Sequence, residues 1–312
     1  MSGTITPPKN RDTASPDPLS ISNPELQQWK TAAIATEQSL PGLLSGEFRQ
    51  ETFALTRRLF IQLQRRPSTL IAGIVQPLMW LILFGALFQN IPEGLFGESQ
   101  NYGQFLGAGI IVFTAFAGAL NAGLPVMFDR EFGFLNRLLV APLASRFSIV
   151  VASALFIAAM SFVQTAAIVA ASAFLGAGLP SASGLLLMAL IVFTLVLGVT
   201  ALSLGLAFAL PGHIELIAVI FVTNLPLLFS STALVPIAFM PRWLQLVASL
   251  NPLSYAIEPI RYLYLHDTWS FASPVLQAPW GNVSLGAALL ILLSFSAAAL
   301  LLIQPLLRRR IA

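Results

Sequence analysis

Charged residues are scarce in this sequence. Only 9% of its 312 residues are charged, whereas 56% are hydrophobic, and the mean hydropathy is +0.81. A soluble domain usually carries about 25% charged residues. So few charges cannot cover the surface of a water-soluble protein of this size, and most of that surface must face lipid.

Cysteine is absent, and histidine occurs only at His213 and His266. These absences exclude a disulfide framework, a thiolate nucleophile and a Cys-based metal site. The segment 201–205 (ALSLG) is close to the G-x-S-x-G elbow of hydrolases but lacks its first glycine, and no histidine is expected at the depth of Ser203. We therefore expect Ser203 to serve packing, with an intramembrane enzyme as the alternative.

The phosphate-binding pattern G-x-x-x-x-G-K-[ST] is also missing. Its lysine could only be Lys9 or Lys30, and neither follows a glycine. The chain is therefore not expected to bind ATP in this way, and we predict no cofactor, no metal and no catalytic residue on it. Any energy from ATP would have to come from a partner protein.

Residues 1–44 contain several prolines among Ser, Thr, Asn and Asp, without the apolar core of a signal peptide. This composition predicts a disordered cytoplasmic tail. Residues 45–312 are predicted to form a single membrane domain.

Six segments are apolar and long enough to cross a bilayer as helices, which takes about 20 residues. They are Leu70–Gln89, Gly103–Val126, Phe147–Gly176, Leu185–Leu210, Leu216–Val235 and Ser284–Gln304. None contains Asp, Glu, Lys, Arg or His, each of which would cost about 2.5–3.5 kcal/mol at the centre of a membrane helix. The sequence thus predicts an all-α integral membrane fold with six spans. A proton- or sodium-coupled transporter is disfavoured, because such proteins usually place ionisable groups inside the membrane.

The basic residues indicate the orientation. With six spans, fourteen of the sixteen Lys and Arg residues lie on one side, and only Arg242 and Arg261 lie on the other. The positive-inside rule places the larger group in the cytoplasm, together with both termini. The net charge of +3 therefore reflects topology, and no nucleic-acid partner is expected.

The stretch between the last two spans is less apolar and rich in proline. Asn251-Pro252 is typical of a helix start, and Pro259 is expected to kink or break the helix that begins there. We predict two short helices from Pro241 to about Leu265 that enter the outer interface without crossing it.

A basic amphipathic helix is predicted before the first span, over Glu47–Arg66. Its apolar positions recur at helical spacing, and arginines occupy much of the rest. Such a helix lies well on anionic headgroups. It is either a membrane anchor only or an elbow helix that also touches a cytoplasmic partner. The residues assigned to it are Phe48, Leu55, Leu59, Arg65 and Arg66.

The loop after the second predicted span has a helical pattern. Phe128, Phe132, Leu135 and Leu139 share one face, acidic residues open the segment, and Pro142 ends it. We predict a short rigid helix, which either joins two spans or is gripped by another protein.

These segments together resemble type-2 ABC exporter permeases, most closely the daunorubicin-resistance branch. The loop motif consists of Asp129, Arg130, Glu131, Gly133, Leu135, Arg137, Leu138, Leu139 and Pro142. The outer-side motif consists of Asn251, Pro252, Tyr255, Glu258 and Arg261. Arg66-Pro67 and Gln76-Pro77-Leu78 match the elbow and the start of the first span.

The resemblance implies a homodimeric permease in a bacterial-type inner membrane, in contact with membrane lipids, that rests on cytoplasmic ABC ATPase subunits. ATP and Mg would be bound by those subunits, and Asp129–Pro142 would be the coupling helix that docks on them. The uncharged spans suit a hydrophobic or amphipathic cargo, such as a drug-like compound or a lipid. A lipid-linked polysaccharide is the main alternative, followed by an ATP-independent transporter.

Overall fold

The computed structural model describes residues 46–65, 67–88, 90, 102–133, 147–174 and 178–309. These residues belong to one compact unit, residues 45–312. The predicted N-terminal tail lies outside the described residues, as do Arg66 and most of the loop between the second and third predicted spans.

Five helical stretches of the described chain are long and apolar enough to cross a membrane. They are α3 (Pro67–Leu87), α4 (Tyr102–Leu120) together with α5 (Gly123–Glu131), α7 (Phe147–Phe174), α8 (Ala182–Ala209) and α12 (Leu285–Arg309). The all-α membrane fold predicted from the scarcity of charge is therefore confirmed.

The fifth predicted span corresponds to α9 (His213–Phe229), which has 17 residues. At a rise of about 1.5 Å per residue, it is at the lower end of the length that a bilayer requires. It is apolar but shorter than the five candidate spans, so the count of six spans stays a prediction.

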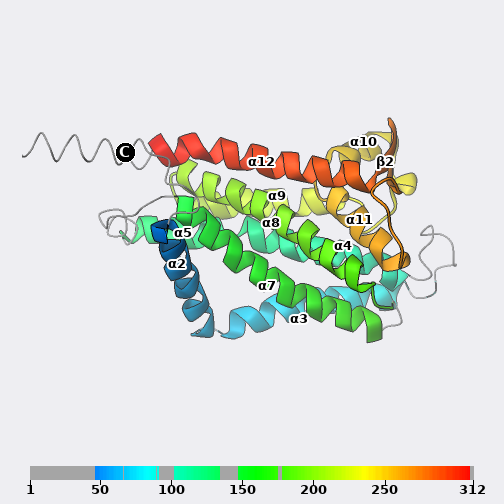
Figure 1. Cartoon of the computed structure of the whole chain (residues 1–312), viewed down its shortest axis with the longest axis horizontal. Coiled ribbons are helices and arrows are strands. Elements are labelled where there is room, and N and C mark those ends of the chain that lie inside the picture. The colour runs from blue at the N-terminus through cyan, green and yellow to red at the C-terminus, as the bar shows by residue number, and fades with distance from the viewer. Residues whose placement is uncertain are drawn as a thin grey trace, which may run out of the picture. The chain divides into compact units, whose positions relative to one another are not determined.

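Helix α8 lies at the centre of the helical bundle and contacts α4, α5, α7, α9, α11 and α12. Its most extensive contact is with α12, which runs beside it in Figure 1. Ser296 Oγ donates to the Thr194 carbonyl over 2.7 Å, and a Cβ added at Gly198 would lie 2.6 Å from Ser296 Oγ. Small residues thus allow the two backbones to approach closely, as is usual in membrane bundles.

The basic amphipathic helix is present as α2 (Gly46–Gln64). It packs against α7, with Phe60 and Phe156 in edge-to-face contact at 5.2 Å. In Figure 1, α2 runs steeply across the direction of the long helices, close to α5. We call this region, which carries α2, α5 and the start of α9, the basic end.

At the opposite end of the long helices lie short elements, in orange and yellow in Figure 1. They are η1 (Ile237–Phe239), α10 (Arg242–Leu250), α11 (Ser254–Leu265), β1 (Pro274–Ala278) and β2 (Gly281–Ser284). The two strands pair antiparallel, and we call this region the hairpin end. The prediction of two short helices before the last span is confirmed, whereas the β-hairpin was not predicted.

Of the two outcomes expected for Pro259, the break is wrong: α11 continues to Leu265, since a proline removes only one ladder hydrogen bond and α11 is held by its buried neighbours. The second predicted span is present as one candidate span, Phe105–Glu131, but its helix is interrupted at residues 121–122, where α4 gives way to α5.

Candidate functional site

The break between α4 and α5 is held by Ser203 of α8. Its hydroxyl accepts a hydrogen bond from Gly123 N at 2.9 Å and donates to the Leu120 carbonyl. A Cβ at residue 123 would lie 2.5 Å from the Ser203 carbonyl oxygen, so only glycine fits. Ser203 is fully buried, and its hydroxyl joins α8 to both sides of the break.

The Asp129-Arg130-Glu131 motif lies in the last turn of α5, not in the first turn of a new helix. The prediction that a helix begins at Asp129 is therefore wrong. Gly133 has φ +73°, a left-handed conformation typical of the residue after a helix. The remaining predicted loop residues, which are Leu135, Arg137, Leu138, Leu139 and Pro142, lie outside the described residues.

Asp129 connects α5 to α2. Both of its carboxylate oxygens accept from Arg58 Nη2, at 2.9 and 3.1 Å. The two side chains are 28% and 31% exposed, so solvent screens the pair only in part. Arg58 was not singled out in the sequence, because five arginines lie at similar positions in that segment.

Arg130 connects α5 to the end of α8. Its guanidinium donates to three carbonyls, those of Ala207, Leu210 and Pro211, at 2.6–2.8 Å. The last carbonyls of a helix have no partner within it, and a cation near them is favoured by the helix dipole. Arg130 thus satisfies the C-terminal end of a 28-residue helix.

Glu131 connects α5 to the start of α9. Its Oε1 accepts from His213 N at 2.7 Å, and its Oε2 lies at hydrogen-bond distance from His213 Nδ1. The His213 ring also packs 5.2 Å from the Phe128 ring. His213 is a functional candidate that the sequence analysis missed, although Gly212-His213 followed by Glu215 does mark a helix start.

The predicted elbow residues of α2 separate into two groups. Phe48 is buried, and Leu55 and Leu59 are half-buried, whereas Arg65 is exposed. The apolar side of the helix therefore packs on the bundle, and the Asp129 contact shows that α2 is joined to the loop-bearing helix as well.

Arg261 makes several polar contacts between elements of the hairpin end. Its Nη1 donates to Glu258 Oε1, its Nη2 donates to the Thr232 carbonyl at 2.7 Å, and its Nε donates to the Phe105 carbonyl at 3.4 Å. The guanidinium carbon lies 3.6 Å from the centroid of the Phe105 ring.

The Arg261–Glu258 pair is largely buried, because the two side chains are only 7% and 14% exposed. Arg261 joins α11 to α4 and to the turn after α9.

Asn251 holds the start of α11 and the end of α9. Its Nδ2 donates to the Leu227 and Ser230 carbonyls at 2.8 and 2.9 Å, and its Oδ1 accepts from Leu253 N at 3.0 Å. The Asn251 side chain therefore caps the C-terminal end of α9 through Nδ2 and the N-terminal end of α11 through Oδ1. Pro252, next to it, is half-buried.

Tyr255 belongs to the same region of α11. Its hydroxyl donates to the Ser249 carbonyl at 2.6 Å, which joins α11 to α10. Burial raises the pKa of its phenol, so the side chain stays neutral and remains a donor.

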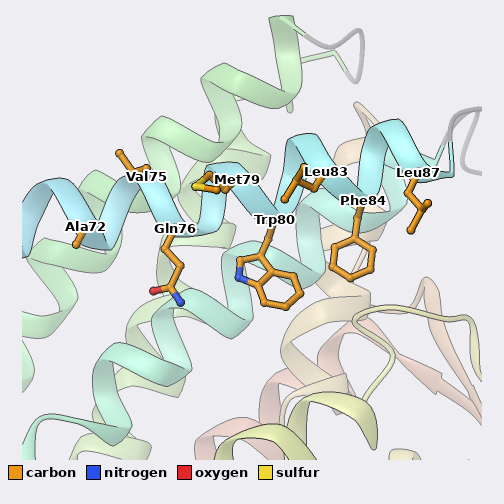
Figure 2. A pocket seen from close by; sticks show the side chains of 8 residues that line it. All are labelled: Ala72, Val75, Gln76, Met79, Trp80, Leu83, Phe84 and Leu87. Carbon is orange, nitrogen blue, oxygen red and sulfur yellow. The ribbon is translucent and has the colours of Figure 1, made fainter.

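An apolar groove of about 520 Å³ lies along α3. Its lining consists of Ala72, Val75, Gln76, Met79, Trp80, Leu83, Phe84 and Leu87. Gln76, Trp80 and Phe84 project from the same side of the helix in Figure 2. The Trp80 and Phe84 rings are stacked, with centroids 5.2 Å apart and an interplanar angle of 11°.

The groove is formed by one face of α3 and carries a single amide and no charge, a composition typical of sites for apolar molecules. Within the described part of the chain, no three His, Asp or Glu residues converge in a way that could bind a metal ion.

Polar contacts at the two ends of long apolar helices are typical of a multi-pass membrane protein. Residues 50–265 match the ABC-2 type transporter family. This chain belongs to that family. It is an ABC-2 permease, the multi-pass membrane subunit of an ABC transporter, and permeases of this family normally work with an ATPase subunit.

Relatives of this permease are found in algae and bacteria. The transport permease ycf38 of Porphyra purpurea is 55% identical over 87% of this chain and 93% of its own length. The ycf38 permease of Cyanophora paradoxa is 53% identical over 92% of this chain and 98% of its own. The doxorubicin resistance ABC transporter permease protein DrrC of Mycobacterium tuberculosis is 27% identical over 69% of this chain and 76% of its own.

Proposed function

We propose that this permease is the membrane half of an ATP-driven exporter of a hydrophobic or amphipathic compound, drug-like or lipid. The observation that carries the cargo class is the α3 groove, which offers stacked aromatic rings and a single amide, Gln76, and no charge. The part of the cargo that lies in the groove must be uncharged, because a charged group there would lose its hydration without gaining an ion pair. The similarity to a doxorubicin resistance permease supports the same class.

The partner of this subunit is a separate cytoplasmic ATPase that binds ATP and Mg²⁺. The permease acts as a homodimer in a bacterial-type inner membrane, with six spans and both termini in the cytoplasm. The arginines of α2 support this orientation, because they gather at the basic end with Arg130 and basic residues favour the cytoplasmic side. α9, although short, serves as the fifth of these six spans.

The ATPase docks at the basic end, on the loop after α5. The side chain of Phe132 at the end of α5 is 81% exposed, so the surface next to the start of that loop is open to a partner. Closure of the two ATPases on ATP then moves the loops, and the two permease copies open a path towards the outside.

The test uses the permease co-purified with its ATPase and reconstituted in liposomes, with doxorubicin as the probe. We expect ATP-dependent movement of doxorubicin and stimulation of ATP hydrolysis by it. Trp80→Ala should reduce both several-fold, because it removes a stacked ring of the groove. Ile82→Ala is the matched control, since Ile82 is an exposed apolar residue of α3 that does not line the groove.

Equal activity of the two variants would remove the groove from the cargo path. If doxorubicin neither moves nor stimulates hydrolysis, while a lipid or a lipid-linked polysaccharide does, the drug-like cargo is wrong and the exporter assignment remains. Absence of ATP-dependent movement for every cargo class would contradict the exporter itself.

A further inference from the structure

The turn between α8 and α9 lacks caps of its own. Helix α9 begins after Gly212, which has no side chain to accept from the first amides of the helix, and α8 ends at Leu210 in extended conformation. The turn is Leu210-Pro211-Gly212, and none of these side chains can form a hydrogen bond. The free groups at two helix ends therefore need partners from elsewhere.

Two adjacent residues of α5 supply both partners. Arg130 donates to carbonyls at the end of α8, and Glu131 accepts from His213 N at the start of α9. Each charge has the sign that the local helix dipole favours, a cation at a C-terminus and an anion at an N-terminus. A Cβ at Gly212 would lie 3.1 Å from Glu131 Oε1 and 2.9 Å from Glu215 Oε2, so the glycine makes room for the carboxylates.

The other end of α5 is fixed to α8 as well. Ser203 bonds to both sides of the α4–α5 break, so the nine residues of α5 are attached to α8 at their beginning and at their end. Gly133, with φ +73°, departs from helical geometry just after α5. Any displacement of α5 must therefore carry α8 and α9 with it or break charge-assisted hydrogen bonds.

We propose that Arg130 and Glu131 are positioning residues that cap α8 and α9 from α5, and so tie the loop after Gly133 to both helices. Their charges act within the permease and do not bind the ATPase. This reverses the expectation that the charged residues of the motif form the docking surface. The capping is independent of the proposed function, whereas the transmission of movement rests on it.

The capping is tested by hydrogen–deuterium exchange of the full-length permease in detergent or nanodiscs. Glu131→Ala should raise the exchange of amides 213–216 about fivefold, the change that loss of a helix N-cap typically produces. Glu131→Gln keeps an acceptor oxygen and should restore most of the protection. Arg130→Lys keeps the charge but loses the forked donor that reaches three carbonyls, and should raise exchange over residues 207–213.

Glu215→Ala is the matched control, because Glu215 is also an acidic residue in the first turn of α9. Unchanged exchange of residues 213–216 in Glu131→Ala would overturn the proposal. An equal rise in Glu215→Ala would also overturn it, because negative charge near the helix start would then suffice without the specific bond.

The transmission is tested in the complex with the ATPase. A single cysteine in place of Ile214, which is 70% exposed on α9, reports movement through its rate of maleimide labelling with and without a non-hydrolysable ATP analogue. We expect the nucleotide-dependent change to be lost in Glu131→Ala and kept in Glu131→Gln, with equal co-purification of the ATPase.

Loss of ATPase binding in Glu131→Ala would show that the carboxylate belongs to the docking surface, against the proposal. If the nucleotide-dependent change in labelling persists in Glu131→Ala, movement reaches α9 by another route, and this outcome would also contradict the proposal. If the unmodified complex shows no change with nucleotide, the ATP-driven function fails, and the exchange experiment still decides the capping.

Discussion

Replacement of Arg261 by methionine should destabilise the permease by about 3–5 kcal/mol, the cost of removing one member of a buried ion pair. The variant leaves the Glu258 carboxylate, 14% exposed, without its cation, and it removes the donor to the Thr232 and Phe105 carbonyls. Methionine has a similar length, so a cavity accounts for little of the loss.

The assay is reversible unfolding in mixed detergent and SDS micelles, followed by tryptophan fluorescence. The double variant Glu258→Gln/Arg261→Met should lose less than Arg261→Met alone, because no unpaired carboxylate remains, and a residual cost of about 1–3 kcal/mol should come from the carbonyls left without a donor. Arg242→Met is the control, since Arg242 is exposed on α10 and should change stability by about 0.5 kcal/mol or less.

A cost below about 1 kcal/mol for Arg261→Met would refute the assignment of a buried, stabilising pair. A double variant no more stable than the single one would refute it too, because Glu258 would then not depend on Arg261.

Close contacts and topology lead to two other predictions. Gly123→Ala should destabilise the chain by about 1–3 kcal/mol in the same unfolding assay, because the new Cβ would lie 2.5 Å from the Ser203 carbonyl oxygen. Gly85→Ala is the control. Its Cβ would meet nothing within 4 Å, so this variant should be neutral or stabilising. Since the chain has no cysteine, a single introduced cysteine reports directly on which side of the membrane it lies. Phe53→Cys on α2 should react only with reagents that reach the cytoplasm, and Trp243→Cys on α10 only with reagents added outside. Labelling of both from one side would contradict the six-span topology.

The membrane fold could be predicted from sequence because its signal is the absence of charge over long segments. The helices α7 and α8 end within a few residues of the predicted limits, since charge or proline stands near their ends. The interruption between α4 and α5 could not be predicted, because the Ser203 hydroxyl that stabilises it comes from a residue 80 positions away.

The charged motif was located by sequence but its orientation was not. A helical pattern through residues 128–139 suggested a helix that starts at Asp129, whereas the chain leaves α5 at Gly133. The pattern is local, and the contacts of Asp129, Arg130 and Glu131 with three other helices are not. The same holds for Arg261, because its place in the outer-side motif gives no information about its burial.

The β-hairpin was missed because its two strands are short and the sequence around it is rich in proline. Pro279-Trp280-Gly281 is a turn signal, and Gly281 has φ +132°, but strands of five and four residues give too little alternation to be recognised.

The position of Arg261 has a consequence for the order in which the protein is assembled during synthesis. Its two carbonyl acceptors belong to residues 156 and 29 positions earlier in the chain, so both have left the ribosome before the arginine does. A guanidinium without these acceptors is poorly tolerated beside hydrocarbon. The segment 254–265 can therefore settle only after α4 and the turn after α9 have come together, whereas α12, which follows it in the chain, joins the bundle later.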